Sequence, residues 1–525
     1  MTQVIIPSAG LGSRLGTITK NINKALIPVG KKPSISYIID WYPKDFNFII
    51  AIGYKGQYIK DYIRIAYPKR DIKFVDVKPF DGPGSGLGYT LKCCNKYIKE
   101  DFFFHTNDGI ILDKINFSAI KTDTIFLSNY RVNSLKYRTV VSKGDCISKF
   151  IDKTPKITPS ASNYVGVAYI KEFKKFKKFL SKISYELGES DYFIDKIKRK
   201  KKVNQITVSS WYDVGDIDDL KRARKDISDF DNLPKEDEFI YFNNDNVIKF
   251  FVDKKLSQKR VLRSKKLGKF VPKIISSADN FYAYNFVPGE LFSTQIDLYK
   301  YLSNFLIDCK KNFWKKFRLS KIEKKNFKNV CLNFYYYKSL DRISSFYQGS
   351  DISDNNEIIN NVKTPTLDSL MLKVDWDFLS SGIPTRIHGD FHFENILKTG
   401  SKKHIFLDWR QDFGGIIEYG DIYYDLAKLY HGIIVDHGAI RNDMFDIKLN
   451  DSKKIIDYEI YRKQSSYKLE KILMDFLKKN KLSVLKVKLL TSLIFLNIAT
   501  LHHQPYSIFL YFLGKDMLNK TLNAK

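Results

Sequence analysis

The sequence predicts an α/β protein with two domains, a doubly wound, mostly parallel sheet followed by a mixed domain dominated by helices. Three observations support this prediction. The length of 525 residues suits two large domains. Over the first ~225 residues, short apolar runs alternate with amphipathic ones at lengths suited to strand–helix–strand units. Beyond residue 298, long helical patterns take over and are interrupted only at 386–408.

The N-terminal half consists of alternating predicted strands and helices. Strands are expected at 4–6, 48–52, 72–77, 102–104 and 124–128, and helices at 34–42, 57–66 and 87–98. Such alternation favours a sheet with helices on both faces. Ligands of such sheets bind beyond the carboxyl ends of the strands, where this chain has its glycines and Asp108.

A polar, acidic stretch at 224–238 has no apolar period and marks the expected domain boundary. We therefore expect a first domain at 1–225, a linker at 226–237 and a second domain at 238–525. The second domain divides into a small, β-rich lobe at about 238–290 and a helical lobe at about 291–525.

The composition indicates a globular protein. Hydrophobic residues make up 44% of the chain and charged residues 28%, which excludes a wholly disordered chain. We expect no signal peptide, and the longest apolar stretch, 489–501, falls short of the ~20 residues that span a bilayer. The five cysteines form no Cys-x-x-Cys pair, so reduced thiols and a cytoplasmic location are expected.

The net charge is strongly positive, because 88 Lys and Arg residues minus 58 Asp and Glu residues give +30. A surface of this charge suits nucleic acid, an anionic membrane or phosphorylated small molecules. No aromatic residues are interleaved with the basic runs, as they are in many RNA-binding modules. We therefore expect small-molecule substrates, and keep a nucleic-acid-binding nucleotidyltransferase as an alternative.

A glycine-containing loop follows the first predicted strand directly. Gly10, Gly12 and Ser13 would let the backbone approach a phosphate chain and offer it N–H groups. Arg14 can bridge phosphate oxygens with its planar guanidinium, and Lys24 supplies a second cation ten residues later. A lone Gly-x-Gly is usually only a tight turn, but the added Ser-Arg-Leu and Lys-Ala-Leu-x-Pro make a nucleotide site the better interpretation.

This block resembles the signature of the sugar-phosphate nucleotidyltransferase family, which includes phosphocholine cytidylyltransferases. Further segments with the family's motif types and spacing lie at 102–108, 150–153, 163–167 and 211–215. The resemblance covers about 1–225 and implies a Rossmann-like, doubly wound nucleotidyltransferase domain.

The resemblance also implies roles for individual residues. Asp108 and Asp213 would hold Mg²⁺, and Lys153 would join Arg14 and Lys24 in neutralising phosphates. The acceptor is a phosphate ester that is mostly dianionic near neutral pH, so it needs no general base, and cations matter most. The sequence departs from the family pattern where Asn23 replaces a Pro and Asn107 replaces a Gly.

The most specific motif of the second half is His-Gly-Asp-x-x-x-x-Asn at 388–395, followed by Asp408. It resembles the catalytic loop and metal aspartate of the aminoglycoside phosphotransferase and choline kinase family, which has a protein-kinase-like α+β fold. The resemblance implies that Asp390 accepts the proton of a substrate hydroxyl, and that Asn395 and Asp408 hold Mg²⁺ on the phosphates of ATP. For His388 we expect a role in bracing the loop.

The ATP lobe matches this family less well. Lys249, in an apolar strand pattern, is the candidate for pairing with ATP phosphates. No glycine-rich loop precedes it, and the segment 257–266 offers no glutamate to pair with it.

Together the motifs suggest two consecutive steps. A kinase makes a phosphate ester from ATP and an alcohol, and a nucleotidyltransferase joins such an ester to a nucleotide from CTP, UTP, GTP or dTTP. We expect the alcohol to be a sugar, and the product to be an activated donor for cell-surface polysaccharide such as capsule. The alternative is a choline-type kinase fused to a cytidylyltransferase, in which aromatic and acidic residues cage a cationic amino alcohol; the candidates are Trp409, Tyr423, Tyr424, Tyr430, Asp421 and Asp425.

Overall fold

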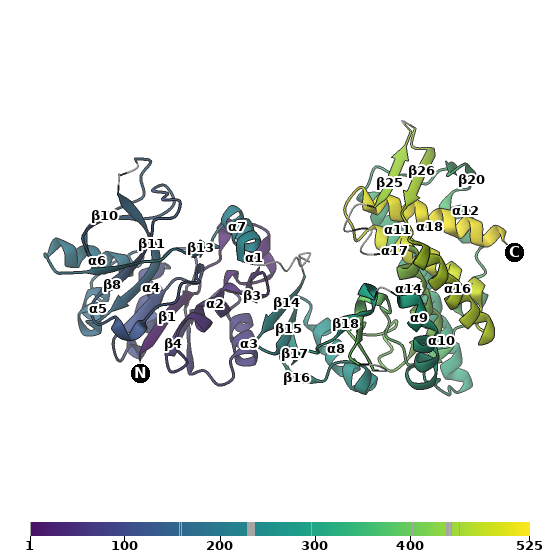
Figure 1. Cartoon of the computed structure of the whole chain (residues 1–525), viewed down its shortest axis with the longest axis horizontal. Helices are drawn as coiled ribbons and strands as arrows, with labels where there is room; N and C mark the ends of the chain where they lie inside the picture. The colour runs from purple at the N-terminus through teal and green to yellow at the C-terminus, as the bar shows by residue number, and fades with distance from the viewer. Residues whose placement is uncertain are drawn as a thin grey trace. The chain divides into compact units, whose positions relative to one another are not determined.

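The computed structural model describes residues 2–156, 158, 160–227, 237–295, 297–400, 403–436, 440, 444–450 and 452–524. Contacts divide the chain into two compact units (Figure 1). The first consists of Met1–Ser257 and Ile275–Phe286, and the second of Gln258–Ile274 and Val287–Lys525. Of the predicted linker, residues 228–236 lie outside the described residues, and helix α7 (Ile217–Ile227) extends into its first two positions.

The first unit is built on a nine-stranded sheet with the order β5-β4-β1-β6-β11-β8-β12-β10-β9. Its strands are β1 (Gln3–Ser8), β4 (Asn47–Ile52), β5 (Ile72–Asp76), β6 (Phe102–His105), β8 (Thr124–Ser128), β9 (Thr139–Lys143), β10 (Cys146–Ile151), β11 (Ala161–Ile170) and β12 (Asn204–Thr207). The five strands predicted from the sequence are all present.

The sheet is mixed rather than mostly parallel. Strands β5, β4, β1 and β6 run parallel, as expected. Strand β11 then inserts between β6 and β8 and is antiparallel to both. The parallel prediction is therefore correct for β5, β4, β1 and β6 and for the β8–β12 pair, and wrong for the pairings of β11, β10 and β9.

Helices cover both faces of this sheet. One face packs against α2 (Ser34–Trp41), α3 (Gly56–Ala66) and α7, and the other against α4 (Leu87–Cys94), α5 (Phe173–Leu180) and α6 (Glu189–Lys198). Within β1, Val4 and Ile6 face the first core and Ile5 faces the second, and all three are fully buried. A strand buried on both faces explains why β1 is a continuous apolar run.

A smaller sheet also belongs mostly to the first unit. Its strands are β14 (Glu238–Asn243), β15 (Asn246–Phe251), β17 (Phe281–Asn285) and β16 (Ile274–Ser277), in that order. The ring of Tyr241 lies 5.1 Å from that of Tyr62 on α3, edge to face, and the Tyr241 hydroxyl donates to the Leu26 carbonyl at 2.8 Å. The contacts thus group this sheet with the N-terminal unit, whereas the sequence pattern groups it with the C-terminal domain.

The second unit is mainly helical. Its longer helices are α8 (Lys254–Leu267, which begins in the first unit), α9 (Leu298–Asp308), α10 (Lys321–Leu332), α11 (Lys338–Gln348), α14 (Ile422–Ile434), α16 (Gln464–Lys479), α17 (Val484–Ala499) and α18 (Tyr506–Asn523). The loop 387–395 leads into a short hairpin of β22 (Ile396–Lys398) and β23 (His404–Phe406). This irregular stretch interrupts the helices where the sequence pattern predicts an interruption.

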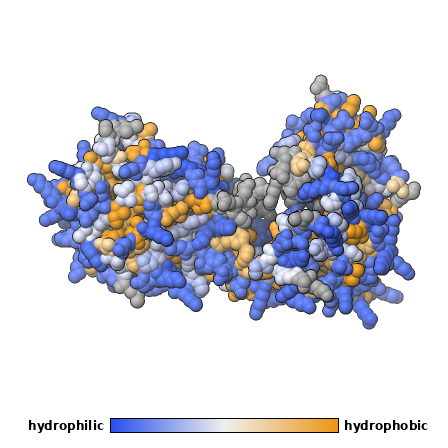
Figure 2. All heavy atoms as spheres, viewed as in Figure 1, coloured by the Kyte–Doolittle hydropathy of each residue, from blue (hydrophilic) through white to orange (hydrophobic). Residues whose placement is uncertain are grey.

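Hydrophilic residues, blue in Figure 2, cover most of the visible face of each unit. Among the described residues, no helix combines the length and apolar character needed to cross a bilayer.

Candidate functional site

The first candidate site begins at the loop after β1. Gly12 has φ +73°, and a Cβ there would lie 3.0 Å from the Cβ of Lys24, so only glycine fits without strain. Asn23 fixes the segment before Lys24 to the end of β1 and to Tyr54, since its side-chain amide donates to the carbonyls of Tyr54 at 2.7 Å and Ser8 at 3.3 Å. The residue that departs from the family's proline therefore anchors Lys24 beside the glycine loop.

Strand pairing brings the two predicted metal-binding aspartates together. Strand β7 (Gly109–Ile111) pairs antiparallel with β13 (Trp211–Asp213), so Asp213 lies opposite Gly109. The Val214 N–H also donates to the Asp108 carbonyl at 2.9 Å.

Three predicted side chains converge beside Gly215. A Cβ at Gly215 would lie 2.9 Å from Asp213 Oδ1, 3.0 Å from Arg14 Nη2 and 3.1 Å from Asp108 Oδ2. Lys24 joins them, because its Nζ lies 2.8 Å from Asp108 Oδ2. The structure therefore brings Arg14, Lys24, Asp108 and Asp213 into one cluster of two cations and two carboxylates.

The two carboxylates differ in their electrostatics. Burial and the neighbouring charge of Asp108 raise the pKa of Asp213 to about 6. Burial also opposes ionisation of Asp108, but the adjacent Lys24 and Arg14 outweigh it and lower the pKa of Asp108 overall. Two adjacent carboxylates are the oxygen donors that Mg²⁺ prefers, so this pair fits the ion that the motif implies. Bound there, Mg²⁺ would neutralise phosphate charge.

The remaining predicted residues of this site are less defined. Ser13 lies in an exposed turn, and a Cβ at Gly10 would meet no atom within 4 Å. Lys153 is exposed after β10, and within the described part of the chain no contact joins it to the aspartate cluster. Its proposed role on an acceptor phosphate stays a prediction.

The sequence reading missed Lys136. This lysine forms ion pairs with both Asp216 and Asp219, just beyond Gly215. The adjacent Tyr137 lies 3.2 Å from Asp219 Oδ2. Neither residue belongs to a recognisable motif, and only the fold reveals them: the Tyr137 ring packs edge to face on Trp211 of β13, with the ring centres 5.0 Å apart.

The second candidate site is formed by the loop that contains Asp390. The Asn395 side-chain amide donates to the Asp390 carbonyl at 2.9 Å and to its Oδ2 at 3.3 Å. Lys428 on α14 lies 3.0 Å from Asp390 Oδ1. The four-residue spacing between Asp390 and Asn395 thus presents both to one place, as expected.

Buried groups brace this loop from behind. Asp425 accepts hydrogen bonds from the N–H groups of His388 at 2.8 Å and Gly389 at 2.7 Å, and from Trp314 Nε1 at 3.0 Å. His388 is fully buried, which lowers its pKa to about 3, and its Nδ1 accepts from the Asp390 N–H at 3.3 Å. Its position fits the expected bracing role.

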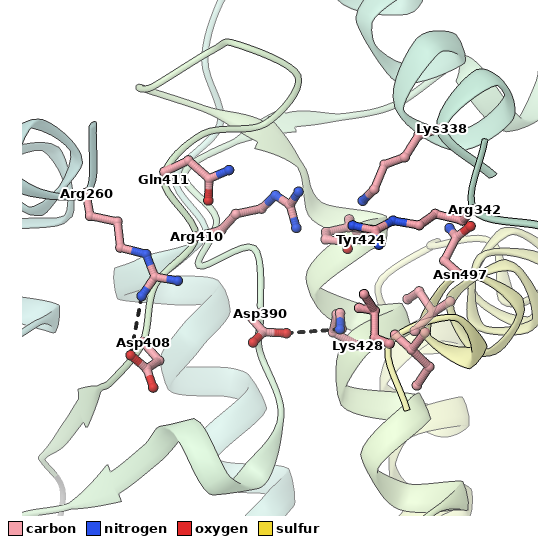
Figure 3. Close-up of a pocket in the computed structure, with 13 residues that line it drawn as sticks. Arg260, Lys338, Arg342, Asp390, Asp408, Arg410, Gln411, Tyr424, Lys428 and Asn497 are labelled. Atoms are coloured by element: carbon pink, nitrogen blue, oxygen red, sulfur yellow. Dashed lines mark hydrogen bonds and ion pairs between the residues drawn. The ribbon is translucent and has the colours of Figure 1, made fainter. Parts of the chain in front are cut away.

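Asp408 lines the same pocket as Asp390 (Figure 3). It has φ +54°, unusual for a non-glycine residue and common at functional sites. The Leu407 N–H donates to the Asn395 carbonyl at 2.8 Å, which ties the two segments together. The oxygen donors of Asn395 and Asp408 suit Mg²⁺, which would carry ATP phosphates there.

Most residues of the alternative amino-alcohol cage are structural. Trp409, Tyr423 and Tyr430 are at most 5% exposed. Asp421 is fully buried and accepts hydrogen bonds from the Tyr335 hydroxyl at 2.8 Å and the Ile383 N–H at 2.9 Å. Of the candidate aromatic residues, only Tyr424 lines the described pocket.

Lys249 lies in the first unit, on β15, and is 2% exposed. Its Nζ lies 3.3 Å from Glu238 Oε1 on the neighbouring strand β14. The expectation that Lys249 lacks a glutamate partner is therefore wrong, because the glutamate lies on the neighbouring strand and not in the segment 257–266.

The geometry of the first unit is that of a site for phosphates and a metal ion. A glycine loop follows a parallel strand, and two cations and two carboxylates surround one point beside it. Sequence comparisons agree with it. The chain is 28% identical over 158 residues to the D-glycero-α-D-manno-heptose 1-phosphate guanylyltransferase of Campylobacter jejuni, covering 29% of this chain and 70% of the relative. It is 24% identical over 239 residues to the enzyme of the same name from Aneurinibacillus thermoaerophilus, covering 43% and 99%.

A third relative is the bifunctional protein GlmU of Methanocaldococcus jannaschii, 29% identical over 232 residues, 43% of this chain; the match spans about half, 54%, of that relative. Among solved structures, the phosphocholine cytidylyltransferase LicC of Streptococcus pneumoniae is similar with a TM-score of 0.38 and 22% identity, covering 43% of this chain and 99% of that one. No protein-family model matches the chain. About 43% of the chain, at its N-terminus, thus matches sugar-phosphate nucleotidyltransferases, which supports nucleotidyltransferase activity there.

Proposed function

We propose that the protein is a bifunctional kinase and nucleotidyltransferase that converts a small alcohol, a sugar, into an activated nucleoside-diphosphate derivative for cell-surface polysaccharide. The observation that carries the nucleotidyl step is the convergence of Arg14, Asp108 and Asp213 beside Gly215. The phosphoryl step is supported by the arrangement of Asp390, Asn395 and Asp408.

In the phosphoryl step, the hydroxyl oxygen of the acceptor forms a bond to the γ-phosphorus of ATP. The bond between that phosphorus and the β–γ bridging oxygen breaks, and ADP leaves with the electron pair. Asp390 is the group placed to take the hydroxyl proton. Lys428, 3.0 Å from Asp390, keeps this carboxylate ionised, and its neighbouring charge contributes to a pKa of Asp390 well below the usual range despite burial.

In the nucleotidyl step, an oxygen of the new phosphate ester attacks the α-phosphorus of a second nucleoside triphosphate. The bond to the α–β bridging oxygen breaks and pyrophosphate leaves, so no proton transfer is needed. Arg14 and Lys24 offset the repulsion between the two anions. Lys153 is proposed to bind the acceptor phosphate.

A two-variant experiment tests this assignment. The full-length protein is incubated with Mg²⁺, ATP, each of CTP, UTP, GTP and dTTP, and a panel of sugars and amino alcohols, and products are identified by mass. Asp390→Ala should abolish phosphorylation but leave transfer to a supplied sugar phosphate intact, and Asp108→Ala should do the reverse. Loss of both steps in either variant, with the protein still folded, would contradict two separate sites.

A further inference from the structure

The pocket beside Asp390 holds more positive than negative charge. It has a volume of about 220 Å³. Its charged lining residues are Arg260, Lys338, Arg342, Arg410, Lys428, Asp390 and Asp408. Lys428 pairs with Asp390 at 3.0 Å and Arg260 with Asp408 at 3.4 Å. Three cations therefore remain without a carboxylate of the pocket to balance them.

These three are Lys338, Arg342 and Arg410. Among the described residues, no carboxylate forms an ion pair with any of them. Lys338 Nζ lies 4.2 Å and Arg410 Cζ 4.9 Å from the centre of the Phe334 ring. Such cation–π contacts only partly offset the loss of hydration on burial, so they do not replace a carboxylate partner. Arg410 Nε is buried and has no hydrogen-bond partner within the described residues.

The electrostatics of Lys338 show the strain of this cluster. Burial, followed by the charges of Arg410, Lys428 and Arg342, lowers the pKa of Lys338 to about 6, although Asp390 opposes the shift. An anion bound among the three side chains would relieve this repulsion. A site that only served the fold would be expected to contain a balancing carboxylate instead.

Lys338 and Arg342 lie on the other side of Asp390 from Asp408 (Figure 3). In Figure 3, Asp408 and Arg260 lie to the left of Asp390, Lys338 and Arg342 lie to its right, and the Arg410 guanidinium lies above it. Lys338 and Arg342 are four residues apart on α11, so they project from one face of that helix. Because the motif implies that Asp408 holds Mg²⁺ on the phosphates of ATP, we expect ATP to bind on the Asp408 side of the pocket.

A further part of the pocket lining comes from α17 and the residues after it, and Asn497 lies beside Arg342 (Figure 3). Ile494 and Ile498 line the pocket there with Leu501, which is 57% exposed. Between them, Asn497 Oδ1 is buried and has no hydrogen-bond donor among the described residues. This part of the lining offers apolar surface for a carbon skeleton and one acceptor for a hydroxyl group.

Building on the kinase function proposed above, we propose that the alcohol phosphorylated at Asp390 already carries an anionic group, a phosphate or a carboxylate, which Lys338, Arg342 and Arg410 bind. The two guanidinium groups match the paired oxygens of either anion. The product then carries the new phosphate ester in addition to the original anion. A quaternary ammonium acceptor would meet the Arg342 and Arg410 guanidinium groups with no pocket carboxylate paired to either, which argues against a choline-type substrate.

Two matched acceptor series test the charge preference in the full-length protein with Mg²⁺ and ATP. One consists of glucose, glucose 6-phosphate, glucuronate and glucosamine, and the other of glycerol, glycerol 3-phosphate, glycerate and choline. We expect kcat/KM for an anionic member to exceed that for its neutral and cationic counterparts by at least about tenfold. The comparison of the phosphate with the carboxylate member of each series shows which anion the pocket binds. Preference for a neutral or cationic member would overturn this inference and leave the kinase standing. Phosphorylation of none would refute the kinase as well.

A double variant tests the residues themselves. Lys338→Gln/Arg342→Gln should raise the KM for the preferred anionic acceptor at least about tenfold, while kcat and the KM for ATP change little. The control, Lys324→Gln/Lys325→Gln, removes the same charge from exposed positions on α10 and should change neither KM. A rise in the KM for ATP instead would show that the cations bind the nucleotide, and an unchanged acceptor KM would show that they bind neither; each result would overturn the inference.

Discussion

Asp425 Oδ1 accepts a hydrogen bond from the Gly389 N–H at 2.7 Å, and Oδ2 of the same carboxylate accepts one from the next N–H upstream. Gly389 has φ +88°, and a Cβ there would lie 2.7 Å from the Cβ of Arg410. The turn that presents Asp390 is therefore fixed by a glycine and by a buried carboxylate on α14. Asp425 acts on the phosphoryl step as a positioning residue, through the backbone.

Asp425→Asn should slow the phosphoryl step selectively. An amide retains one acceptor oxygen and turns the other into a donor that cannot pair with a backbone N–H. Losing a buried hydrogen bond to a charged group costs about 1.5–3 kcal/mol, so kcat for phosphorylation should fall at least about tenfold. The KM for ATP should change little, and nucleotidyl transfer by the same protein should be unchanged. Initial rates of ADP and pyrophosphate formation measure the two steps.

Asp421→Asn, at the N-cap of the same helix, is the matched control. Asp421 is also fully buried and accepts from the Tyr423 N–H, but it contacts no part of the loop 388–390 within the described residues. It should lower thermal stability with a smaller effect on phosphorylation. Equal losses of kcat in the two variants would mean that general destabilisation, and not loop position, explains the first result.

Gly215→Ala should disable nucleotidyl transfer. Gly215 does not have a positive φ, so alanine suits its backbone, but the added methyl group would meet Asp213 Oδ1 at 2.9 Å, Arg14 Nη2 at 3.0 Å and Asp108 Oδ2 at 3.1 Å. The ends of these side chains can move, so the fold should survive while the carboxylates lose their geometry. We expect transfer to fall by about 10²-fold or more, as for other misplaced catalytic groups, and phosphorylation to be unchanged.

Gly400→Ala provides the comparison, because a Cβ at Gly400 meets no atom within 4 Å. Both steps should keep their rates in that variant. Wild-type transfer by Gly215→Ala would contradict the placement of the site beside this glycine.

Local patterns were enough to predict five strands and three helices of the first unit and the loops that carry chemistry, but not β9 to β12 or α5 to α7. Apolar runs such as β1 and the glycines of the first loop are readable because neighbours in sequence determine them. The pairing of β7 with β13, which joins Asp108 to Asp213, depends on residues far apart in the chain. The resemblance suggested both aspartates, but only the sheet shows how they meet.

The same reasoning explains what the sequence left out. Lys338 and Arg342 belong to a helix with no catalytic motif, and they reach the pocket of Asp390 only through the packing of α11 in the second unit. The partner of Lys249 was missed because Glu238 lies on the neighbouring strand β14, diagonally across from Lys249, and not on a helix. Side chains that meet their partners only in the folded chain leave no pattern in the sequence from which those contacts can be predicted.

Glu189 should make stability depend on pH. It is 3% exposed and accepts a hydrogen bond from the Tyr164 hydroxyl at 2.9 Å, and burial raises its pKa from 4.5 to about 7. The folded protein therefore binds this proton more tightly than the unfolded chain does. Its contribution to stability is fully present below pH 4.5 and is lost as the pH rises to about 7, by up to about 3 kcal/mol.

Glu189→Gln removes this dependence. The difference in the free energy of unfolding between the variant and the wild type should be more favourable to the variant at pH 8 than at pH 4.5. Urea unfolding at both pH values measures it. Glu172 is the control of opposite sign, because hydrogen bonds from Lys175 and Lys196 lower its pKa. Glu172→Gln should lose more stability at pH 8 than at low pH. A shift of the same sign in both variants would contradict the assignment of the Glu189 pKa.

Asn23→Pro tests the departure from the family's proline. Asn23 has φ −70° and follows an extended residue, Ile22 (φ −143°, ψ 155°), so the backbone already suits proline. The substitution removes the side-chain hydrogen bonds to Ser8 and Tyr54 and the cap on the Ala25 N–H. Each costs about 1 kcal/mol, so the free energy of unfolding should fall.

Asn23→Ala loses the same bonds without stiffening the unfolded chain. The proline variant should therefore be more stable than the alanine variant by about 0.4–1 kcal/mol, with both below wild type in urea unfolding. Because Lys24 follows directly and pairs with Asp108, nucleotidyl transfer should also be slower in both variants, and less so in the proline variant. If the proline variant proves the less stable of the two, its ring strains the loop, and Asn23 is required by the backbone as well as by its side-chain bonds.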